Sequence, residues 1–250
     1  MREAPGIEGL KNLIAQSQNI VFFGGAGVST ESNIPDFRSA SGLYQQGGTA
    51  LPPEKMLHID FFMEKPADFF AYYFANMVHA EAKPNAAHTA LAALEQQGKL
   101  KAVITQNVDG LHQQAGSRKV IELHGTVHRN FCMDCRAPHT LADVLASAPK
   151  IPHCKTCGGI VKPDVTLYGE QLPVGAFEEA EAYVQAADVL IIGGTSLSVY
   201  PAAGLVRYYQ GENMVLINQD ATAHDHLAQW VFRDKIGEVL RACVKGSRSL

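Results

Sequence analysis

The sequence predicts an α/β fold in which helices cover both faces of a parallel sheet, with a smaller lobe inserted into it. Short runs of uniformly apolar residues alternate along the 250-residue chain with segments of helical periodicity, as in buried parallel strands joined by helices. Two long stretches interrupt this alternation, and one of them carries two closely spaced pairs of cysteines. The alternation predicts the sheet, and the interruptions predict the second lobe.

The predicted elements of the large domain follow one another from the N-terminus. Residues 7–14 have apolar side chains at helical spacing, and residues 20–23, IVFF, form an apolar run typical of a buried strand before a glycine turn. The same criteria predict, in chain order, a helix at 86–94, strands at 102–104 and 120–123, a helix at 176–187, a strand at 189–192, a helix at 202–209 and a strand at 214–217.

The two interruptions are residues 37–84 and residues 127–162. The first contains turn-rich sequence and then an aromatic helix, PADFFAYYFANMVHAEA, and the second contains the paired cysteines. A chain of 250 residues corresponds to one large domain or to one domain with an inserted module. We therefore expect the two interruptions to form the smaller lobe.

Composition and charge exclude several classes of protein. An apolar fraction of 46% and a charged fraction of 18% are ordinary for a globular chain. The net charge is −4 and the 21 Lys and Arg residues are scattered, which argues against tight nucleic-acid binding. The sequence shows neither an apolar run of the roughly 20 residues that a spanning helix needs nor the features of a signal peptide. We expect a cytoplasmic protein without a membrane partner.

Glycine or polar residues follow every predicted strand. The segments are GGAGVST at 24–30, QNVDG at 106–110, HG at 124–125, GTS at 194–196 and NQD at 218–220. In an open parallel sheet, ligands bind beyond the carboxyl ends of the strands, where glycine turns and helix N-termini present backbone N–H groups. Any one segment could be an ordinary turn, but five at one edge of a sheet predict a nucleotide site.

The first of these segments resembles a dinucleotide-binding fingerprint only in part. Gly25 and Gly27 are in place, but Thr30 occupies the position of the third glycine. The sequence also has no acidic residue near position 45, where a dehydrogenase would hold the adenosine ribose. This argues against hydride transfer and leaves NAD itself open as the cofactor.

His124 is the candidate for proton transfer. It follows a predicted strand and precedes Gly125, which places its imidazole beside Asn107 and Asp109 if the two strands are neighbours. Histidine is the side chain best suited to proton transfer near neutral pH, although a single histidine is more often structural. The position of His124 at the carboxyl end of a strand favours the catalytic interpretation.

The paired cysteines predict a structural zinc site. Cys132 and Cys135 form one C-x-x-C pair, Cys154 and Cys157 form the other, and 18 residues separate the pairs. Four thiolates at this spacing suit a tetrahedral zinc ribbon and leave no open position for catalysis. The fifth cysteine, Cys243, continues an apolar helical stripe and is predicted to be a core residue.

The segments GAGVSTESNIPDFRSASGLY, TQNVDGLHQQAG, ELHGTVHRNFC, KPDVTLYGE and GTSLSVYPAAGL, with the two C-x-x-C pairs, resemble the sirtuin family in order and spacing over roughly residues 6–245. The resemblance implies a Rossmann-like domain joined to a small domain that has a helical module and a zinc-ribbon module. The implied ranges are 1–36, 85–126 and 167–250 for the Rossmann-like NAD-binding domain, 37–84 for the helical module and 127–166 for the zinc-ribbon module.

The resemblance also implies an activity, that of an NAD-dependent protein-lysine deacetylase that releases nicotinamide, O-acetyl-ADP-ribose and deacetylated lysine. His124 would be the catalytic base, and Asn107 would position the ribose or a water molecule. Carried over position by position, the NAD-binding residues would be Ala26, Thr30, Phe37, Arg38, Gln106, Val108, Asp109, His124, Thr195, Ser196, Asn218 and Ile236. The extended acetyl-lysine peptide would pair with a strand edge that includes Thr166, Tyr168 and Val199.

Two alternatives to this activity stay open at this point. A mono-ADP-ribosyltransferase would use the same NAD chemistry with a different acceptor. A zinc-ribbon module that binds nucleic acid or protein would use the α/β part only as a scaffold. The acidic balance of the chain and the polar strand ends argue against the second alternative.

Three features depart from the family pattern or decide its details. Asn33 stands where the family usually has glycine, and asparagine tolerates the left-handed conformation, so we expect the turn to survive. Leu167 and Tyr168 replace a common Phe-Phe, which could alter the acyl tunnel. An acid-preferring subset of the family has Tyr-x-x-Arg where this chain has Tyr72 and Ala75, which predicts a preference for neutral acyl groups.

Overall fold

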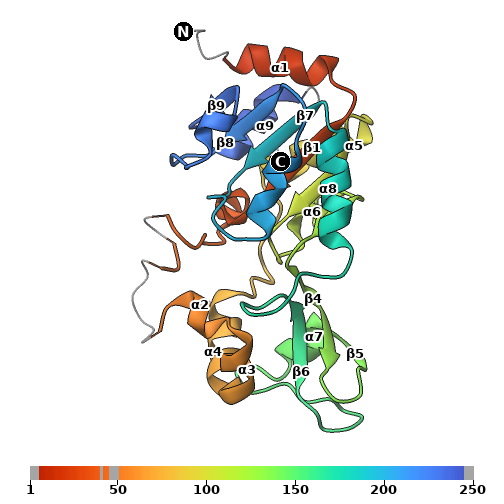
Figure 1. Cartoon of the computed structure of the whole chain (residues 1–250). Coiled ribbons are helices and arrows are strands. Elements are labelled where there is room, and N and C mark those ends of the chain that lie inside the picture. The colour runs from red at the N-terminus through yellow and green to blue at the C-terminus, as the bar shows by residue number, and fades with distance from the viewer. Residues whose placement is uncertain (1–5, 40–41, 45–50, 245–250) are drawn as a thin grey trace.

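The computed structural model describes residues 6–39, 42–44 and 51–244. The ends of the predicted domain ranges, residues 1–5 and 245–250, and part of the predicted helical module lie outside the described residues. The protein has a larger lobe built on a six-stranded sheet and a smaller lobe that contains a three-stranded sheet and several helices (Figure 1).

The larger sheet is entirely parallel and has the strand order β3-β2-β1-β7-β8-β9. Its strands are β1 (Ile20–Gly24), β2 (Leu100–Thr105), β3 (Val120–Glu122), β7 (Val189–Gly193), β8 (Met214–Ile217) and β9 (Trp230–Phe232). The five strands predicted from the sequence are confirmed. The edge strand β9 was missed, because a three-residue strand between polar residues is too short to show a pattern.

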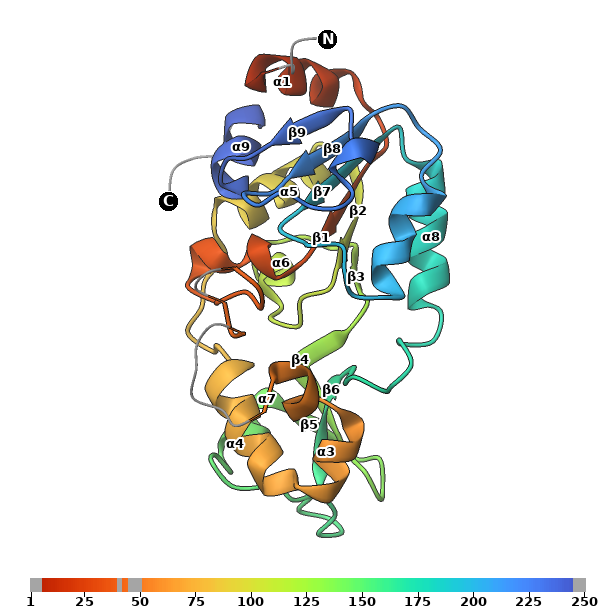
Figure 2. The same ribbon diagram turned by 60° about the vertical axis from the view of Figure 1, so that its left-hand side comes forward.

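Two apolar layers cover this sheet. One layer contains α1 (Ile7–Gln16), α5 (Ala86–Gln96) and α9 (Ile236–Cys243), and its core includes Phe22 and Leu91. The other contains α8 (Ala176–Ala186) and the 3₁₀ helix η3 (Ala202–Tyr208), and its core includes Phe23. Figure 2 shows α8 and α9 on opposite sides of the sheet. The strands have apolar side chains on both faces because both faces are covered.

The remaining elements of the larger lobe are short. They are α6 (Leu111–Gln114) and the 3₁₀ helices η1 (Ala26–Val28), η2 (Thr30–Ser32) and η4 (Asp225–Leu227). The predicted helix at 202–209 is therefore helical but of the 3₁₀ type, and Gly204 in its middle weakens the α-helical propensity of the segment. Asn33, which ends η2, has φ 62° and ψ 25°, so the predicted left-handed turn is confirmed.

The smaller lobe consists of an antiparallel sheet and a group of helices. Its strand order is β5-β4-β6, with β4 (Gly125–Cys132), β5 (Pro138–Thr140) and β6 (Val161–Val165), and its helices are α2 (Pro53–Met56), α3 (Ile59–Glu64), α4 (Pro66–Asn76) and α7 (Leu141–Leu145). Aromatic rings of α3 and α4 form the core of the helical part, with Phe62 and Phe69 in edge-to-face contact at 5.0 Å between ring centroids.

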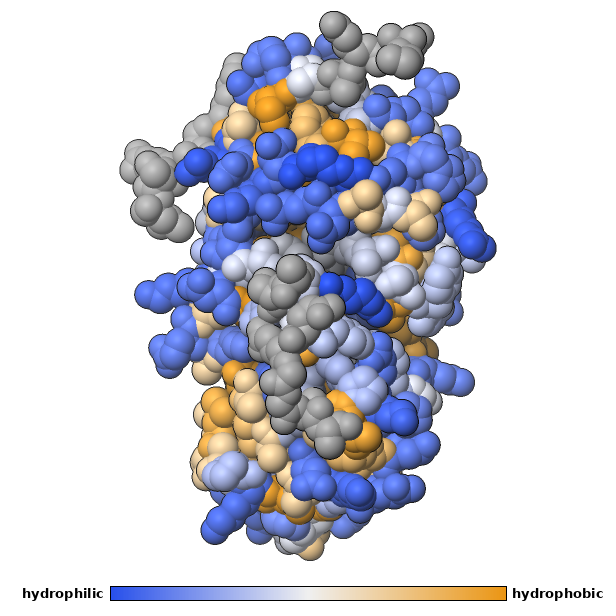
Figure 3. All heavy atoms as spheres, turned by 90° about the vertical axis from the view of Figure 1, so that its left-hand side faces the viewer, coloured by the Kyte–Doolittle hydropathy of each residue, from blue (hydrophilic) through white to orange (hydrophobic). Residues whose placement is uncertain are grey.

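The surface of the protein is mainly hydrophilic on the face that Figure 3 shows, with hydrophobic residues visible in both lobes. Within the part of the chain that the structure describes, no helix has the length and apolar character needed to cross a membrane.

The chain order of the sheet reverses between its central strands, β1 and β7, and both strands end in glycine pairs. Gly27 N–H donates to the Gly194 carbonyl oxygen at 2.8 Å, so the two turns that follow these strands are in direct contact. Gly194 has φ +59°, and a Cβ added to it would lie 2.6 Å from the Gly27 carbonyl carbon. Only glycine fits at this contact.

We predict that Gly194→Ala lowers the free energy of unfolding by about 3 kcal/mol or more, since a methyl group would meet backbone atoms that cannot move aside. Gly98→Ala is the matched control. Gly98 also has a positive φ, +72°, but open space surrounds its missing Cβ, so only the conformational cost of about 1–2 kcal/mol applies. Denaturant unfolding of both variants measures the difference, and equal losses would contradict the steric explanation.

Candidate active site

His124 follows the carboxyl end of β3 of the larger lobe and directly precedes β4 of the smaller lobe. Its Nδ1 is 3.1 Å from the Gln106 carbonyl oxygen, in the segment that follows the neighbouring strand β2. A carbonyl oxygen can only accept a hydrogen bond, so Nδ1 must carry the proton and Nε2 must hold the lone pair. Burial lowers the pKa of His124, and the bond to Gln106 opposes this. The structure therefore favours a neutral imidazole with Nε2 ready to accept a proton.

Gly125 is required directly after this base. It has φ +71°, and a Cβ in its place would overlap the carbonyl oxygen of Asp164 in β6. Thr166 N–H also donates to the His124 carbonyl oxygen at 2.9 Å. β4, which begins at Gly125 directly after His124, therefore lies against β6 of the smaller lobe.

Asn107 and Asp109 meet at a hydroxyl group that the sequence analysis did not single out. Ser29 Oγ donates to Asp109 Oδ2 at 2.7 Å and accepts from Asn107 Nδ2 at 3.1 Å. The second carboxylate oxygen of Asp109 accepts from Leu111 N–H at 2.9 Å, at the start of α6. The orientation of both predicted site residues is therefore fixed by Ser29, which is buried. Its only sequence signal is its place in the glycine turn.

Two buried histidines lie behind Asp109. The rings of His88 and His112 have their centroids 4.7 Å apart. Burial lowers the pKa of His88 to about 4, although the charge of Asp109 opposes this, and burial lowers the pKa of His112 well below its usual range. Both imidazoles are neutral near neutral pH, and His88, the one that senses the charge of Asp109, therefore adds no charge beside that carboxylate.

A second line of hydrogen bonds runs along the sheet edge from His124 toward β8. Thr195 Oγ1 donates to Gln106 Oε1 at 2.8 Å, and Asn218 Nδ2 donates to the Thr195 carbonyl oxygen at 2.6 Å. The carbonyl oxygen of the same Gln106 faces His124. The structure thus joins predicted residues from the ends of β2, β3, β7 and β8.

The turn after β1 contains Ala26, in η1, and Thr30, in η2. Ser29 N–H donates to the Ala26 carbonyl oxygen at 3.0 Å, and Thr30 Oγ1 donates to the Gly27 carbonyl oxygen at 3.0 Å. These local bonds give the turn a fixed shape next to Asp109.

Phe37 and Arg38 follow this turn and approach the smaller lobe. The Phe37 carbonyl oxygen accepts from Tyr44 N–H at 2.9 Å, and the Arg38 guanidinium lies 5.4 Å from the centre of the Tyr44 ring. Burial raises the pKa of Tyr168, and the neighbouring Arg38 opposes that rise. Arg38 therefore lies beside the predicted substrate strand.

Four further predicted residues occupy different surroundings. Ser196 is exposed and its hydroxyl is 2.8 Å from that of Ser198, while the Val199 carbonyl oxygen accepts from Ala203 N–H at 2.9 Å. Val108 is partly buried against the hydrophobic core of the smaller lobe. Ile236 packs into the core of the larger lobe, and its side chain is 5% exposed. Of these four, Ile236 offers the least surface to a ligand.

The predicted substrate strand, residues 166–168, is joined to neighbouring segments by backbone hydrogen bonds at both of its ends. Tyr168 N–H donates to the Leu57 carbonyl oxygen at 3.0 Å, and Ile59 N–H donates to the Tyr168 carbonyl oxygen at 2.9 Å. Thr166 N–H already donates to His124. The N–H groups of Thr166 and Tyr168 are thus engaged within the protein, which restricts what this segment can offer to a peptide.

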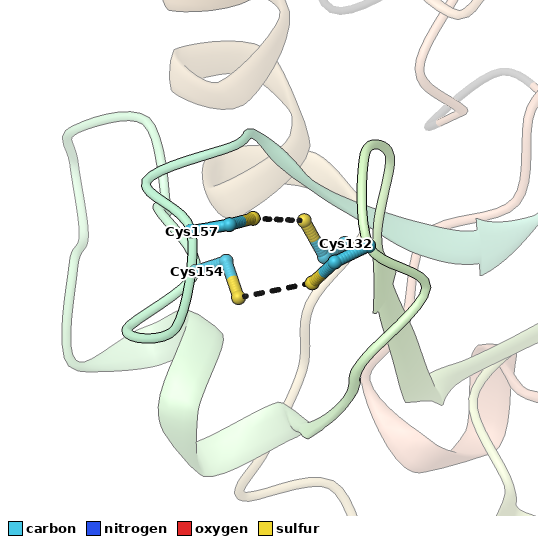
Figure 4. A group of neighbouring side chains, drawn as sticks. Cys132, Cys154 and Cys157 are labelled. Atoms are coloured by element: carbon cyan, nitrogen blue, oxygen red, sulfur yellow. Dashed lines mark hydrogen bonds between the residues drawn. The ribbon is translucent and has the colours of Figure 1, made fainter.

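The four predicted metal ligands are brought together in the smaller lobe (Figure 4). Cys132 Sγ lies 3.4 Å from Cys157 Sγ, Cys135 Sγ lies 3.7 Å from Cys154 Sγ, and all four sulfur atoms are within 4.8 Å of one another. Sulfur atoms bound to one zinc ion at about 2.3 Å would be about 3.8 Å apart in a tetrahedron. The cluster therefore fits a zinc ion, and it lies apart from the base.

The cysteine cluster also has the local electrostatics of a thiolate site. Backbone N–H groups of Thr156 and Cys157 lower the pKa of Cys154 to about 5. The pKa of Cys132 is lowered by the backbone N–H groups of Cys135 and Asp134. Thiolates are the form of cysteine that binds metal, so one cysteine of each pair is preorganised for zinc. The Gly159 N–H lowers the pKa of Cys157, but the neighbouring thiols of Cys132 and Cys135 outweigh it and raise that pKa to about 12.

Comparison with known proteins decides the family. The sequence model of the Sir2 family matches residues 25–201. The chain belongs to the Sir2 family. This family assignment confirms the sirtuin resemblance that the sequence motifs indicated, and the parallel sheet with a cysteine cluster confirms the predicted fold class.

Relatives of the Sir2 protein match it over nearly its whole length. An NAD-dependent protein deacetylase of Clostridium acetobutylicum is 55% identical, and the match covers 95% of this chain and 98% of the relative. A protein of the same description from Clostridium tetani is 56% identical over 94% of this chain and 96% of its own.

Solved structures of Sir2 proteins are also similar to this chain over nearly its whole length. A Sir2 enzyme structure that is 38% identical has a TM-score of 0.88 and covers 98% of both chains. A Sir2 variant with a deacetylated peptide and 3′-O-acetyl ADP ribose is 37% identical, has a TM-score of 0.86 and covers 95% of this chain and 97% of its own.

We predict that Cys154→Ala loses stoichiometric zinc and lowers the thermal unfolding midpoint strongly, because metal binding in a four-thiolate site is coupled to folding of the ribbon. Cys243→Ala is the control, since Cys243 is a buried cysteine of α9 outside the cluster. The Cys243→Ala protein should retain its zinc. Elemental analysis and thermal unfolding of both proteins give the answer. A wild-type protein without zinc, or a Cys154→Ala protein that retains it, would show the assignment to be wrong.

Proposed function

We propose that this Sir2-family protein is an NAD-dependent protein-lysine deacetylase that acts on acetyl-lysine in proteins or peptides. Its products are nicotinamide, O-acetyl-ADP-ribose and the deacetylated lysine. The observation that carries the proposal is the position of His124, whose Nε2 is the unprotonated atom of a neutral imidazole at the edge where five polar strand ends meet. The names of two relatives above 50% identity support the same activity.

The residues at this edge suit NAD by their chemistry. Amide, hydroxyl and carboxylate groups of Asn107, Asp109, Thr195 and Asn218 lie in two hydrogen-bonded groups at the edge of the sheet where its chain order reverses, and dinucleotides bind there in folds of this kind. NAD, when bound, supplies the ribose carbon to which the acetyl oxygen becomes attached as nicotinamide leaves.

The proposed roles of individual residues are those that the family resemblance implies, and the contacts of each residue are compatible with them. His124 accepts a proton at Nε2 from a ribose hydroxyl, while the Gln106 carbonyl oxygen holds Nδ1–H in place. Asn107 and Asp109 orient the nicotinamide ribose and the carboxamide, and Ser29 fixes both side chains. Thr195 and Asn218 bind on the adenosine side. Ala26, Thr30, Phe37 and Arg38 close over the cofactor from the turn after β1.

The zinc ion has a structural role in this proposal. Four cysteines complete a tetrahedral shell, so no ligand position is left for a substrate. Cysteines that hold zinc as thiolates suit a reducing compartment, so the proposal places the protein in the cytoplasm. The domain ranges implied by the family resemblance are retained as part of the proposal.

Nicotinamide release from NAD tests the activity. Release that requires an acetyl-lysine peptide, with deacetylated peptide and O-acetyl-ADP-ribose appearing in equal amounts, supports deacetylation. Labelling of protein with ADP-ribose in the absence of acetyl-lysine would instead support the mono-ADP-ribosyltransferase. A protein that binds peptide but leaves NAD intact would support the binding-module alternative.

We predict that His124→Ala lowers turnover by about a hundredfold or more while NAD affinity stays within a few-fold, because loss of a general base costs about that factor. The pH profile adds a second readout. Burial lowers the pKa of His124 from the ordinary histidine value of 6.5, so the imidazole is still neutral at pH 6.5. We therefore expect kcat/KM to decline on the acid side only below pH 6.5. Unaltered turnover in the folded variant would remove His124 from the mechanism.

We predict a preference for acetyl over succinyl groups. Tyr72 of α4 is buried and Ala75 is exposed, and residues 69–77 contain neither arginine nor lysine. Burial and the charge of Glu54 both raise the pKa of Tyr72, so a negative charge is already close to this position. A succinyl carboxylate would lack a charge-assisted partner and would lose hydration.

Comparing kcat/KM for matched acetyl- and succinyl-lysine peptides measures this preference, and we expect at least about a tenfold ratio in favour of acetyl, the equivalent of 1.4 kcal/mol. Ala75→Arg should shift the ratio toward succinyl. Ala67→Arg, an exposed position two turns earlier in α4, controls for added charge. A succinyl value equal to the acetyl value would contradict the prediction.

A further inference from the structure

Lys162 is a buried lysine in β6 with a full set of hydrogen-bond acceptors. Its side chain is 4% exposed. Its ammonium group lies 3.0 Å from Glu170 Oε2, 3.1 Å from the Val165 carbonyl oxygen and 3.3 Å from the Pro163 carbonyl oxygen. An ammonium group has three donors, so each of them has a partner. A buried charge is tolerated only when it is paired and hydrogen-bonded in this way.

The acceptors around Lys162 all belong to the segment that runs into the proposed substrate strand. Pro163 and Val165 are in β6, and Glu170 lies beyond Tyr168. The chain from 163 to 170 therefore wraps around a single buried ammonium group. Since β6 ends at Val165, the residues after it have left the antiparallel sheet and lack its ladder bonds.

Glu170 extends this arrangement to the strand itself. Its Oε2 also accepts from Leu167 N–H at 2.8 Å, and its own N–H donates to the Leu167 carbonyl oxygen at 3.0 Å. One carboxylate oxygen thus joins the buried lysine to the middle residue of the segment 166–168. The outer residues of that segment bond to His124 on one side and to Leu57 and Ile59 on the other.

We propose that the Lys162–Glu170 ion pair positions the acetyl-lysine-binding strand, residues 166–168, and so determines the affinity for peptide without affecting the affinity for NAD. The inference rests on the proposed deacetylase function, because it assigns the segment to substrate. Lys162 touches neither the predicted substrate nor the predicted cofactor residues through its own side chain, and it acts through Glu170 and the backbone. It is therefore a positioning residue.

The geometry separates this role from a general contribution to stability. In the described part of the chain, the residues predicted to bind NAD at the ends of β1, β7 and β8 form no hydrogen bond with either side chain of the pair. Loss of the ammonium group would release Glu170 and then Leu167. A shift of about 1 Å in a positioning element can change rates or binding by roughly a hundredfold.

The test uses the full-length zinc-bound protein and a fluorescent acetyl-lysine peptide. Lys162→Met keeps the aliphatic stem beside the Phe131 ring but removes the charge. We expect it to weaken peptide binding by roughly tenfold or more while the Kd for NAD stays within about twofold. Lys162→Arg should restore most of the binding. Lys119→Met, which breaks the Lys119–Glu179 pair on the larger lobe, is the matched control and should change neither constant.

Glu170→Gln provides a second, milder variant in case Lys162→Met does not fold. Gln can still accept from Leu167 N–H, and Lys162 keeps its two carbonyl partners. Because both substitutions act through one contact, the double variant should bind peptide no more weakly than the worse single variant.

Unchanged peptide binding in a folded, zinc-loaded variant would overturn the proposal. An equal loss of peptide and NAD binding, or loss of zinc, would also overturn it, since either result would show a stabilising role only. Deacetylation by the wild-type protein is measured in parallel. Its absence would count against the proposed function, whereas the peptide-binding comparison would still decide the role of the ion pair.

Discussion

The structure depends on a close approach of two backbone turns at the centre of the larger sheet. Gly27 and Gly194 are in direct contact where the chain order of the sheet reverses, and neither position has room for a Cβ. β1 and β7 end side by side at Gly24 and Gly193, and the turns that follow them stay in contact. The carboxyl ends of the remaining strands then face one edge, and Asn107, Asp109, His124 and Asn218 lie there.

A second close approach sets the position of the smaller lobe. Gly125 leaves the larger sheet directly after His124 and pairs with Val165 of β6, so the base stands at the joint between the lobes. The same β6 continues into the segment that bonds to Leu57 and Ile59 of the helical part. The zinc ribbon and the helices are therefore organised around one strand, which explains how residues far apart in sequence can flank one site.

The sequence predicted what depends on local pattern. The apolar runs located five strands of the sheet, the spacing of the cysteines located the metal cluster, and Asn33 was correctly expected in a left-handed turn. Contacts between distant segments could not be predicted. Ser29 looks like an ordinary turn residue until the fold brings it to Asp109, 80 positions away, and β9 has no pattern of its own. The roles of the site residues stay predictions.

The partial match to the dinucleotide fingerprint has a structural explanation. In a simple βαβ unit the acid that follows the second strand lies about 20 residues beyond the glycine turn. Here the helical part of the smaller lobe is inserted between β1 and β2, so the segment that follows the strand beside β1, which contains Asp109, lies far beyond the glycine turn in sequence. One carboxylate oxygen of Asp109 accepts a hydrogen bond from Ser29 Oγ, and the other accepts from Leu111 N–H. The bond to Ser29 directs the carboxylate toward the turn after β1. The long spacing in sequence between the glycine turn and Asp109 therefore reflects the inserted helices. The ligand that this edge of the sheet can bind has to be inferred from the residues at the strand ends, because the spacing of the fingerprint does not apply.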